Sequence, residues 1–200
     1  MKIICASSSK NRERLFKRMK FDLEFVNPDF PEIIDDQFSP AENVQNFAYG
    51  KALSVFPQFE KEKDVIIMGF DSLSVFDGKV YGKPKSKKEA LEMIQAFRGN
   101  EQDIISGVSI VGKFKGKFFQ LTDHEITKIF FRDDYTNCQI HKYLEFDDYS
   151  DKCGAYSILG PGQFFIRKIE GDFQNVVGVP IFKLTDMIQQ VTGRNPLGIL

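Results

Sequence analysis

Histidine, cysteine and tryptophan are scarce in this 200-residue chain, which has two His, three Cys and no Trp. The two histidines, His124 and His141, support neither a Ser-His-Asp arrangement nor a zinc enzyme. The three cysteines, Cys5, Cys138 and Cys153, are widely spaced and form no Cys-x-x-Cys pair, which argues against a disulfide framework or a zinc knuckle. The sequence therefore predicts buried free thiols in a reducing compartment.

Long apolar runs and a strong charge of one sign are also missing. No stretch approaches the roughly 20 apolar residues of a membrane span, and the apolar run in "MKIICASSS" is too short for a signal peptide. The formal net charge of -1 argues against a protein that coats nucleic acid, which would be basic. We therefore expect a cytoplasmic protein that binds neither nucleic acid nor membrane.

Apolar residues are plentiful, at 42% of the chain, and their spacing changes repeatedly along it. Runs typical of strands alternate with segments that have helical spacing, and the Asp77-Gly78 hairpin signal shows that the sheet is not purely parallel. The sequence thus predicts a mixed α/β fold in a single domain, 1–200, and leaves open a smaller lobe around 103–145. The strand-like segments are 2–6, 21–30, 64–70, 74–82, 103–112, 117–131 and 163–171. The helical segments are 7–19, 39–56, 86–99, 134–146 and 180–191.

Two of the helices have explicit start signals. Ser39, Pro40 and Glu42 make a capping box with Pro in the first turn, and Ser86 with Glu89 repeats the pattern. Gly99 is placed to end the second of these helices.

The segment "CASSSKNRER" takes a strand into a helix through three serines. The first N–H groups of a helix lack internal partners and carry a positive partial charge, so serine hydroxyls and Arg12 there suit a phosphate. Ser7 belongs to this cluster. The alternative is that Ser9 simply caps the helix and Arg12 is solvated.

The loop "NPDFPEIIDD" holds four acids: Asp29, Glu32, Asp35 and Asp36. Mg²⁺ prefers oxygen ligands, often one or two carboxylates together with substrate phosphates. The loop is therefore a candidate metal ligand donor, or alternatively a solvated acidic loop.

Lys51 falls on the apolar stripe of the helix at 39–56. An ammonium group that points inward needs a partner or a wet cleft, unless the side chain extends past the apolar edge to water. Both interpretations stay open. The stripe consists of Val44, Phe47, Ala48, Ala52 and Val55.

Asp71 closes the apolar run at 64–70, and Lys83 follows one hairpin later. Ligands of open α/β sheets gather at the carboxyl ends of strands, so Asp71 is a candidate metal ligand or proton acceptor. Lys83, before Pro84 in a stiffened segment, could reach a phosphate. The alternatives are a turn-capping Asp and a surface charge. Together with Arg12, Lys51 and Glu32, these residues form the set that phosphoanhydride hydrolysis requires.

The order of these segments resembles that of the Maf family, the septum-formation-associated nucleoside triphosphate pyrophosphatases, over nearly the whole chain. "ASSSKNR" is similar to the family's Ala-Ser-x-Ser-Pro-Arg-Arg, and "FAYGKA" to its Leu-Ala-x-x-Lys-Ala. The other matching segments are "PDFPE", "GFDS", "VFDGKVYGKPKSKKEALEMI", "DKCGAY" and "IEGDFQNVVGVPIFKL". "GAY" at 154–156 is closer to the branch that acts on dTTP and UTP than to the 7-methyl-GTP branch.

The resemblance implies an elongated mixed sheet flanked by helices, with two lobes around a cleft, as in Maf and inosine triphosphatase-like proteins, often as a homodimer. It implies Mg²⁺- or Mn²⁺-dependent hydrolysis between the α and β phosphates of a pyrimidine or modified nucleoside triphosphate. Asp71 corresponds to the proton acceptor, and Glu32 with Asp71 to the metal ligands. The phosphate-binding positions are Ser7, Arg12, Lys51 and Lys83.

The chain departs from the family pattern at Asn11, Phe70, Gln102 and Leu159. Leu159 stands at the position that sets substrate specificity, where the pyrimidine branch has Gln. Two alternatives stay open: a catalytically weakened nucleotide-binding protein that acts in cell-division control, and an inosine triphosphatase-like house-cleaning enzyme.

Overall fold

The structure, a computed structural model, describes residues 1–146 and 149–198. The strands are β1 (Lys2–Ala6), β2 (Glu24–Val26), β3 (Val65–Phe76), β4 (Lys79–Tyr81), β5 (Glu101–Phe114), β6 (Lys117–Phe131) and β7 (Ile166–Glu170). The α-helices are α1 (Lys10–Arg18), α2 (Pro40–Val55), α3 (Lys87–Phe97), α4 (Asn137–Tyr143), α5 (Phe173–Val176) and α6 (Ile181–Thr192). Short 3-10 helices span Phe56–Phe59, Cys153–Ala155, Pro161–Phe165 and Pro196–Gly198.

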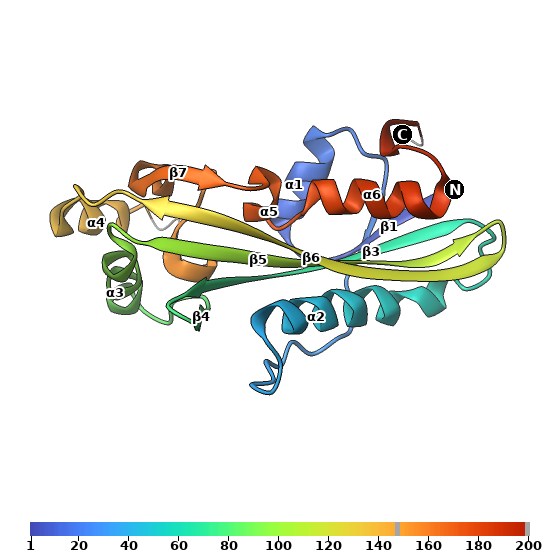
Figure 1. Cartoon of the computed structure of the whole chain (residues 1–200), viewed down its shortest axis with the longest axis horizontal. Helices are drawn as coiled ribbons and strands as arrows, with labels where there is room; N and C mark the ends of the chain where they lie inside the picture. The colour runs from blue at the N-terminus through green and yellow to red at the C-terminus, as the bar shows by residue number, and fades with distance from the viewer. Residues whose placement is uncertain (147–148, 199–200) are drawn as a thin grey trace. The chain divides into compact units, whose positions relative to one another are not determined.

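The strands form one seven-stranded mixed sheet in the order β2-β1-β3-β5-β6-β7, with β4 paired to β3. β1 pairs in parallel with both β2 and β3, whereas β4 and β7 run antiparallel to β3 and β6. Helices flank the strands (Figure 1). This arrangement confirms the predicted mixed α/β class.

The chain divides into two compact units, each of which is discontinuous in sequence. The first unit contains 1–72, 106–125 and 177–200, and the second contains 73–105 and 126–176. The prediction of one domain with a smaller lobe around 103–145 stays a prediction. Among the described residues, no helix is long and apolar enough to cross a membrane.

Helices cover both faces of the strands in the first unit. Successive side chains of β3 point to opposite faces, so Ile66, Met68 and Phe70 pack in the cluster with α1 and α6. Val65 and Ile67 pack on the other face with α2. A strand buried on both faces explains the continuous apolar run that precedes Asp71.

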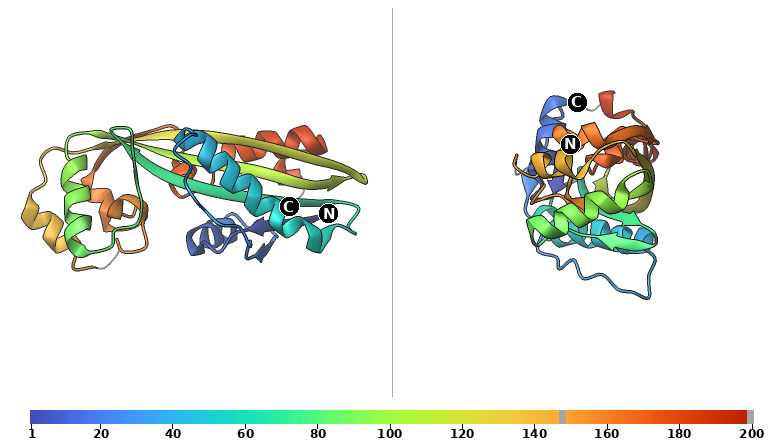
Figure 2. Two further views of the ribbon diagram at one scale, coloured as in Figure 1. Left: turned by 90° about the horizontal axis from the view of Figure 1, so that it is seen from below. Right: turned by 90° about the vertical axis from the view of Figure 1, so that its left-hand side faces the viewer.

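Glycines let α2 approach the sheet closely. A Cβ at Gly69 of β3 would lie 2.0 Å from the carbonyl oxygen of Ala48, and one at Gly107 of β5 would lie 2.1 Å from that of Val44. Neither position has room for a side chain, so the α2 backbone lies directly on β3 and β5. Figure 2 shows α2 running across these strands, and the connection before it, at 28–39, extending outward.

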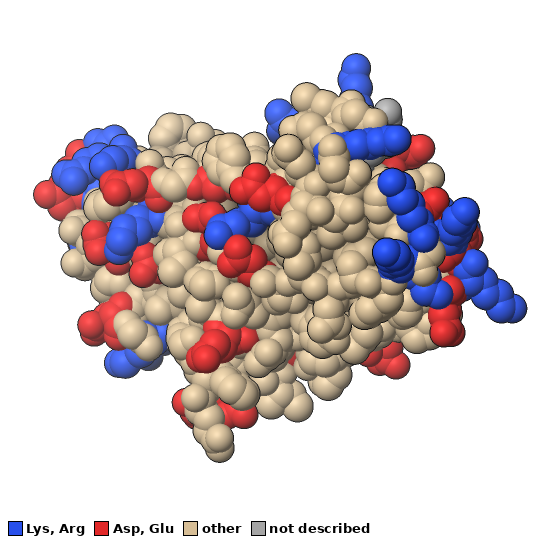
Figure 3. Space-filling view, turned by 45° about the vertical axis from the view of Figure 1, so that its right-hand side comes forward, with Lys and Arg blue, Asp and Glu red and all other residues tan. Residues whose placement is uncertain are grey.

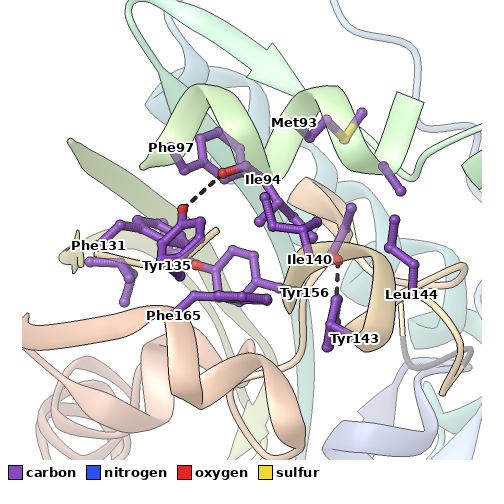
Figure 4. Packing of buried hydrophobic residues seen from close by; sticks show 14 residues of the cluster. Met93, Ile94, Phe97, Phe131, Tyr135, Ile140, Tyr143, Leu144, Tyr156 and Phe165 are labelled. Carbon is purple, nitrogen blue, oxygen red and sulfur yellow. Dashed lines mark hydrogen bonds between the residues drawn. The ribbon is translucent and has the colours of Figure 1, made fainter. Parts of the chain in front are cut away.

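The second unit has an aromatic core of its own. Phe97 of α3 packs against Phe131 of β6 and against Tyr156, with ring centroids 5.2 and 6.4 Å apart respectively. The Tyr135 hydroxyl donates to the carbonyl of Ile94 (2.8 Å), so this buried phenol is satisfied. Figure 4 shows these side chains converging between α3, α4 and the strand ends.

Two predictions about the strands and helices need correction. Asp71 does not close a strand: β3 continues through it to Phe76, and the hairpin to β4 begins only there. At α3, Ser86 accepts from the Glu89 N–H as predicted, but the Glu89 carboxylate accepts from the N–H of Lys85 (2.7 Å). That donor lies one residue before the one a capping box uses, so only half of the box forms.

The cysteines are free, as predicted, but they are not all buried. Cys5 is buried in β1, whereas Cys138 is exposed and Cys153 is half-buried. Burial raises the pKa of the Cys5 thiol to about 12, so this group is not a thiolate at neutral pH.

Positive and negative side chains both occur on the face drawn in Figure 3, with blue side chains predominating at its right-hand edge. Over the described residues, several charged side chains form exposed ion pairs, such as Lys2 with Glu62 (2.6 Å) and Lys128 with Glu101 (2.9 Å). Exposed pairs of this kind contribute at most about 1 kcal/mol each. Buried charges are therefore more informative about function than these exposed pairs.

Candidate active site

The site begins with Asp71 in the middle of β3. Its side chain points to the α2 face of the strand, two residues after Gly69, where the helix backbone touches the sheet. Lys51 lies on the buried stripe of α2, three residues after Ala48. Because helix and strand are so close, the Lys51 ammonium reaches the Asp71 carboxylate at 2.6 Å.

Lys51 is the centre of a three-residue charge cluster. Its Nζ lies 2.5 Å from Glu32 Oε1 and also donates to the Phe70 carbonyl (3.2 Å). Lys51 is 5% exposed and Asp71 7%, whereas the Glu32 side chain is 54% exposed. The sequence left open whether Lys51 points inward or extends to water. In the structure it points inward and has partners.

The environment of Asp71 favours its protonated form more than water does. Burial raises the pKa of this carboxyl above its ordinary value, and nearby Glu32 adds to the increase. The Lys51 ammonium and, more weakly, Arg12 oppose it. The sum is a carboxylate with a raised pKa, the property required of a proton acceptor that works near neutral pH.

The loop that carries Glu32 is fixed at both ends. The Phe30 ring lies on Gly50 of α2, where a Cβ would come within 2.2 Å of it. At the other end the buried Asn43 amide donates to the carbonyls of Asp35 (3.0 Å) and Phe38 (3.2 Å). The sequence analysis missed Asn43, although a polar residue among the apolar positions of a predicted helix was a usable signal.

Arg12 is buried and holds three parts of the first unit together. Nε donates to the carbonyl of Gly178 (2.8 Å), while Nη1 and Nη2 donate to the hydroxyls of Ser7 and Ser72 (3.3 Å each). Ser9 does cap α1, because its hydroxyl accepts from the Arg12 N–H. The alternative interpretation was therefore right about the cap and wrong about a solvated Arg12.

Gly178 and Ser106 complete the surroundings of Arg12, and the sequence analysis predicted neither as a site residue. Gly178 has φ +95, and a Cβ there would lie 3.2 Å from the Arg12 guanidinium. The Ser106 hydroxyl lies 2.8 Å from that of Ser72, on the neighbouring strand. Residues so far from Arg12 in sequence give no local signal that they meet it.

Phe70 does not contribute to the burial of the Asp71 carboxylate, because the two side chains lie on opposite faces of β3. It is fully buried on the opposite face of β3, with its ring centroid 6.0 Å from that of Phe16. The Arg12 guanidinium lies 5.6 Å from the same ring centroid. The large side chain at position 70 therefore makes a cation-π contact with the Arg12 guanidinium.

The structure brings Ser7 and Arg12 together, and likewise Glu32, Lys51 and Asp71, all in the first unit. Lys83 and Leu159 belong to the second unit, where both are exposed.

The donor set fits one kind of metal binding. Among the residues at 1–146 and 149–198, no group of three or more His, Cys, Asp and Glu side chains could hold a metal ion. Glu32 and Asp71 are two carboxylates, already arranged around a cation, the Lys51 ammonium. Mg²⁺ is commonly held by one or two carboxylates plus substrate phosphates, and this pair fits that mode rather than a closed cage.

A family model described as "Maf-like protein" matches residues 2–191, and the chain belongs to this family. A relative from Clostridium botulinum (strain Hall), named dTTP/UTP pyrophosphatase, is 39% identical over 194 residues, covering 94% of this chain and 96% of the relative. Another protein of that name, from Caldanaerobacter subterraneus, is 33% identical over 193 residues, covering 96% of this chain and 90% of the relative.

Among solved structures, the chain is similar to the Ham1 protein of Staphylococcus aureus. The two are 15% identical, with a TM-score of 0.47, and the match covers 95% of this chain and 99% of the other.

Proposed function

We propose that this chain hydrolyses the α-β phosphoanhydride of a pyrimidine or modified nucleoside triphosphate, with dTTP and UTP as the leading substrates. The observation that carries the proposal is the buried Lys51–Asp71 pair with Glu32 beside it. Support for the substrate class comes from the relatives named dTTP/UTP pyrophosphatase.

In this proposal Asp71 accepts the proton of the attacking water. The oxygen of that water forms a new P–O bond, the bond between phosphorus and the bridging α-β oxygen breaks, and the electron pair leaves with the bridging oxygen. The products are a nucleoside monophosphate and pyrophosphate. The raised pKa of Asp71 suits this step, because a carboxylate with a higher pKa is a stronger base and accepts the proton of water more readily.

The cations supply charge neutralisation. Lys51, Arg12 and Lys83 are proposed to bind phosphate oxygens, and the Ser7 hydroxyl to donate to one of them. Glu32 and Asp71 would hold Mg²⁺ or Mn²⁺, which would supply Lewis-acid polarisation of the phosphates when bound. Leu159 is proposed to lie against the base. The cytoplasmic location and the homodimer stay predictions.

The test is pyrophosphate release from a panel of triphosphates: dTTP, UTP, CTP, 7-methyl-GTP and ITP, each with Mg²⁺, Mn²⁺ or a chelator. We expect release from dTTP or UTP that requires a divalent cation. In Asp71→Asn, which keeps the shape and removes the base, we expect kcat to fall about 10²–10⁴-fold.

The matched control is Glu170→Gln, which removes an exposed carboxylate of β7 that pairs with Lys168 (2.7 Å). It should retain wild-type activity. Wild-type protein that binds the triphosphates but releases no pyrophosphate from any of them would contradict the proposal, as would full activity in Asp71→Asn.

A further inference from the structure

Gln102 of β5 is a buried amide with both ends in use. It is 1% exposed. Its Nε2 donates to the Ser74 hydroxyl of β3 (2.7 Å), and its Oε1 accepts from the Tyr156 hydroxyl (2.7 Å). Tyr156 is itself buried against Phe131, with ring centroids 5.2 Å apart. A buried polar bridge whose members are all hydrogen-bonded makes the groups that it joins rigid.

The bridge fixes a segment of unusual backbone. Gly154 has φ +76 and Ala155 has φ +64, a conformation that costs energy for a residue with a side chain. A Cβ at Gly154 would lie 3.1 Å from the Ser74 hydroxyl oxygen and 3.2 Å from Gln102 Nε2. The segment at 154–156 therefore lies directly on the Ser74–Gln102 pair.

The same segment is tied to Lys83 and continues into Leu159. The N–H of Gly154 donates to the carbonyl of Gly82 (3.1 Å), the residue before Lys83. Leu159 follows Tyr156 by three residues, and its N–H donates to the Ser157 hydroxyl (3.3 Å). A shift of the segment at 154–156 would therefore shift the backbone next to Lys83 and next to Leu159.

We propose that Gln102 is a positioning residue for nucleotide binding. By bridging Ser74 and Tyr156 it holds the segment at 154–159, and through Gly154 it sets the backbone that presents Lys83. This inference rests on the proposed function, in which Lys83 binds phosphate and Leu159 lies against the base. It assigns a role to an amide that touches neither.

The chain offers a matched pair of variants. Tyr156→Phe removes the hydroxyl bonded to Gln102, and Tyr135→Phe removes another buried hydroxyl of the same core, bonded to Ile94. Both variants lose one buried hydrogen bond, but only the first loosens 154–159. We expect Tyr156→Phe to raise KM for dTTP about tenfold with kcat within about twofold, and Tyr135→Phe to leave KM unchanged.

Gln102 itself is tested by Gln102→Met and Gln102→His. Met keeps the length and loses the bridge, so its KM should rise as in Tyr156→Phe. A neutral imidazole has one donor and one acceptor and can replace the amide, whereas an imidazolium cannot accept from Tyr156. We therefore expect wild-type KM for Gln102→His at high pH and a rise in KM at low pH that the wild type lacks. Because burial lowers the pKa of an imidazole, this rise should begin below its ordinary pKa of about 6.5.

A readout without turnover separates this inference from the proposed function. In amide hydrogen exchange, the segment at 154–159 should lose protection in Tyr156→Phe and Gln102→Met and keep it in Tyr135→Phe. If the wild type releases no pyrophosphate, the proposed function fails. Amide hydrogen exchange would still test whether the Ser74–Gln102–Tyr156 bridge holds the segment at 154–159. Equal exchange in all variants, or a KM unchanged in Gln102→Met, would overturn the positioning role.

Discussion

Lys51 is the residue that pairs with the buried carboxylate of the first unit, Asp71. It is 5% exposed, it contacts Glu32 and Asp71, and the latter is 7% exposed. A buried ion pair adds little to stability compared with an apolar pair of the same shape, but removal of one member leaves an unpaired buried charge. The presence of such a pair is therefore better explained by a role in function than by a gain in stability.

Lys51→Met should accordingly destabilise the protein by about 3–5 kcal/mol at pH 7, measured by urea unfolding. Without Lys51, the pKa of Asp71 rises further in the folded state, while the unfolded carboxyl keeps its ordinary value of about 3.9. The folded state then binds the proton more tightly, so stability falls as pH rises above that value. The deficit relative to wild type should therefore be smaller at pH 4 than at pH 7.

The control is Lys88→Met, which removes an exposed lysine of α3 that lies 3.8 Å from Glu92. Its free energy of unfolding should change by less than about 0.5 kcal/mol. The double variant Lys51→Met/Asp71→Asn should recover part of the loss, because no buried charge remains unpaired. Equal effects of Lys51→Met and Lys88→Met would show that burial of the pair is not energetically important.

Residue-level prediction from the sequence succeeded where a local pattern existed. Lys51 could be singled out because an ammonium interrupts an apolar helical stripe, and the structure places it inward. The partners of Arg12 could not be foreseen, since Gly178 lies 166 residues away. No spacing rule connects residues that meet only in the folded sheet.

At the scale of elements, the contact of α2 with the sheet decides whether the charge cluster can form. Gly69 and Gly107 remove the side chains that would hold the helix away, and Lys51 then reaches Asp71. Gly50 serves a different contact, since it makes room for the Phe30 ring of the loop that carries Glu32. Glycines thus allow α2 to contact the sheet on one side and the loop that carries Glu32 on another.

These contacts predict a graded response to an added methyl group. In Gly69→Ala the new Cβ would meet backbone, which cannot turn away, so we expect a loss of about 1–3 kcal/mol or more and a large fall in kcat. In Gly50→Ala it would meet the Phe30 ring, which can turn. That variant should lose less stability, but the concentration of Mg²⁺ needed for half-maximal activity should rise as Glu32 shifts.

Gly198→Ala is the control, because a Cβ there has no atom of the described residues within 4 Å. Unfolding by urea and a Mg²⁺ titration of activity would compare the three variants. A Gly69→Ala protein as stable and active as Gly198→Ala would refute the close approach of α2 to β3.

Elements with strong local signals were predictable from the sequence, and the length of β3 was not. The capping box of Ser39 and Glu42 forms as predicted at the start of α2. The acid at position 71 and the hairpin signal at Asp77-Gly78 suggested a break that is absent, because Asp71 is satisfied by Lys51 within the strand. The prediction relied on the cost of burying an unpaired carboxylate within a strand. Lys51, from another element, removes that cost by pairing with Asp71.

At the scale of the whole molecule, the order of residues along the chain does not follow the two compact units. The chain passes between units at 72/73, 105/106, 125/126 and 176/177. Hydrophobic periodicity reports helices and strands but not which of them share a core. The sequence therefore predicted the class of fold and most elements, while the division of β3, β5 and β6 between units required the structure.

Ligand binding should be visible in the stability of the whole chain. A triphosphate that binds only the folded state stabilises it by about 2.7 kcal/mol at a hundred times Kd. For a chain of this size that corresponds to a rise in Tm of about 5–10 °C. Asp71→Asn is the protein to use, since it keeps the proposed phosphate-binding cations and should hydrolyse dTTP about 10²–10⁴-fold more slowly than the wild type during the scan.

Thymidine is the control ligand, because it has the base without the phosphates and should leave Tm nearly unchanged. Lys83→Ala and Lys85→Ala in the Asp71→Asn background form a matched pair, since both lysines are exposed in the loop after β4. Only Lys83→Ala should reduce the dTTP-induced shift. A shift of equal size with thymidine would mean that the phosphates are not what the cations bind, and an equal effect of the two lysine variants would remove Lys83 from the phosphate-binding set.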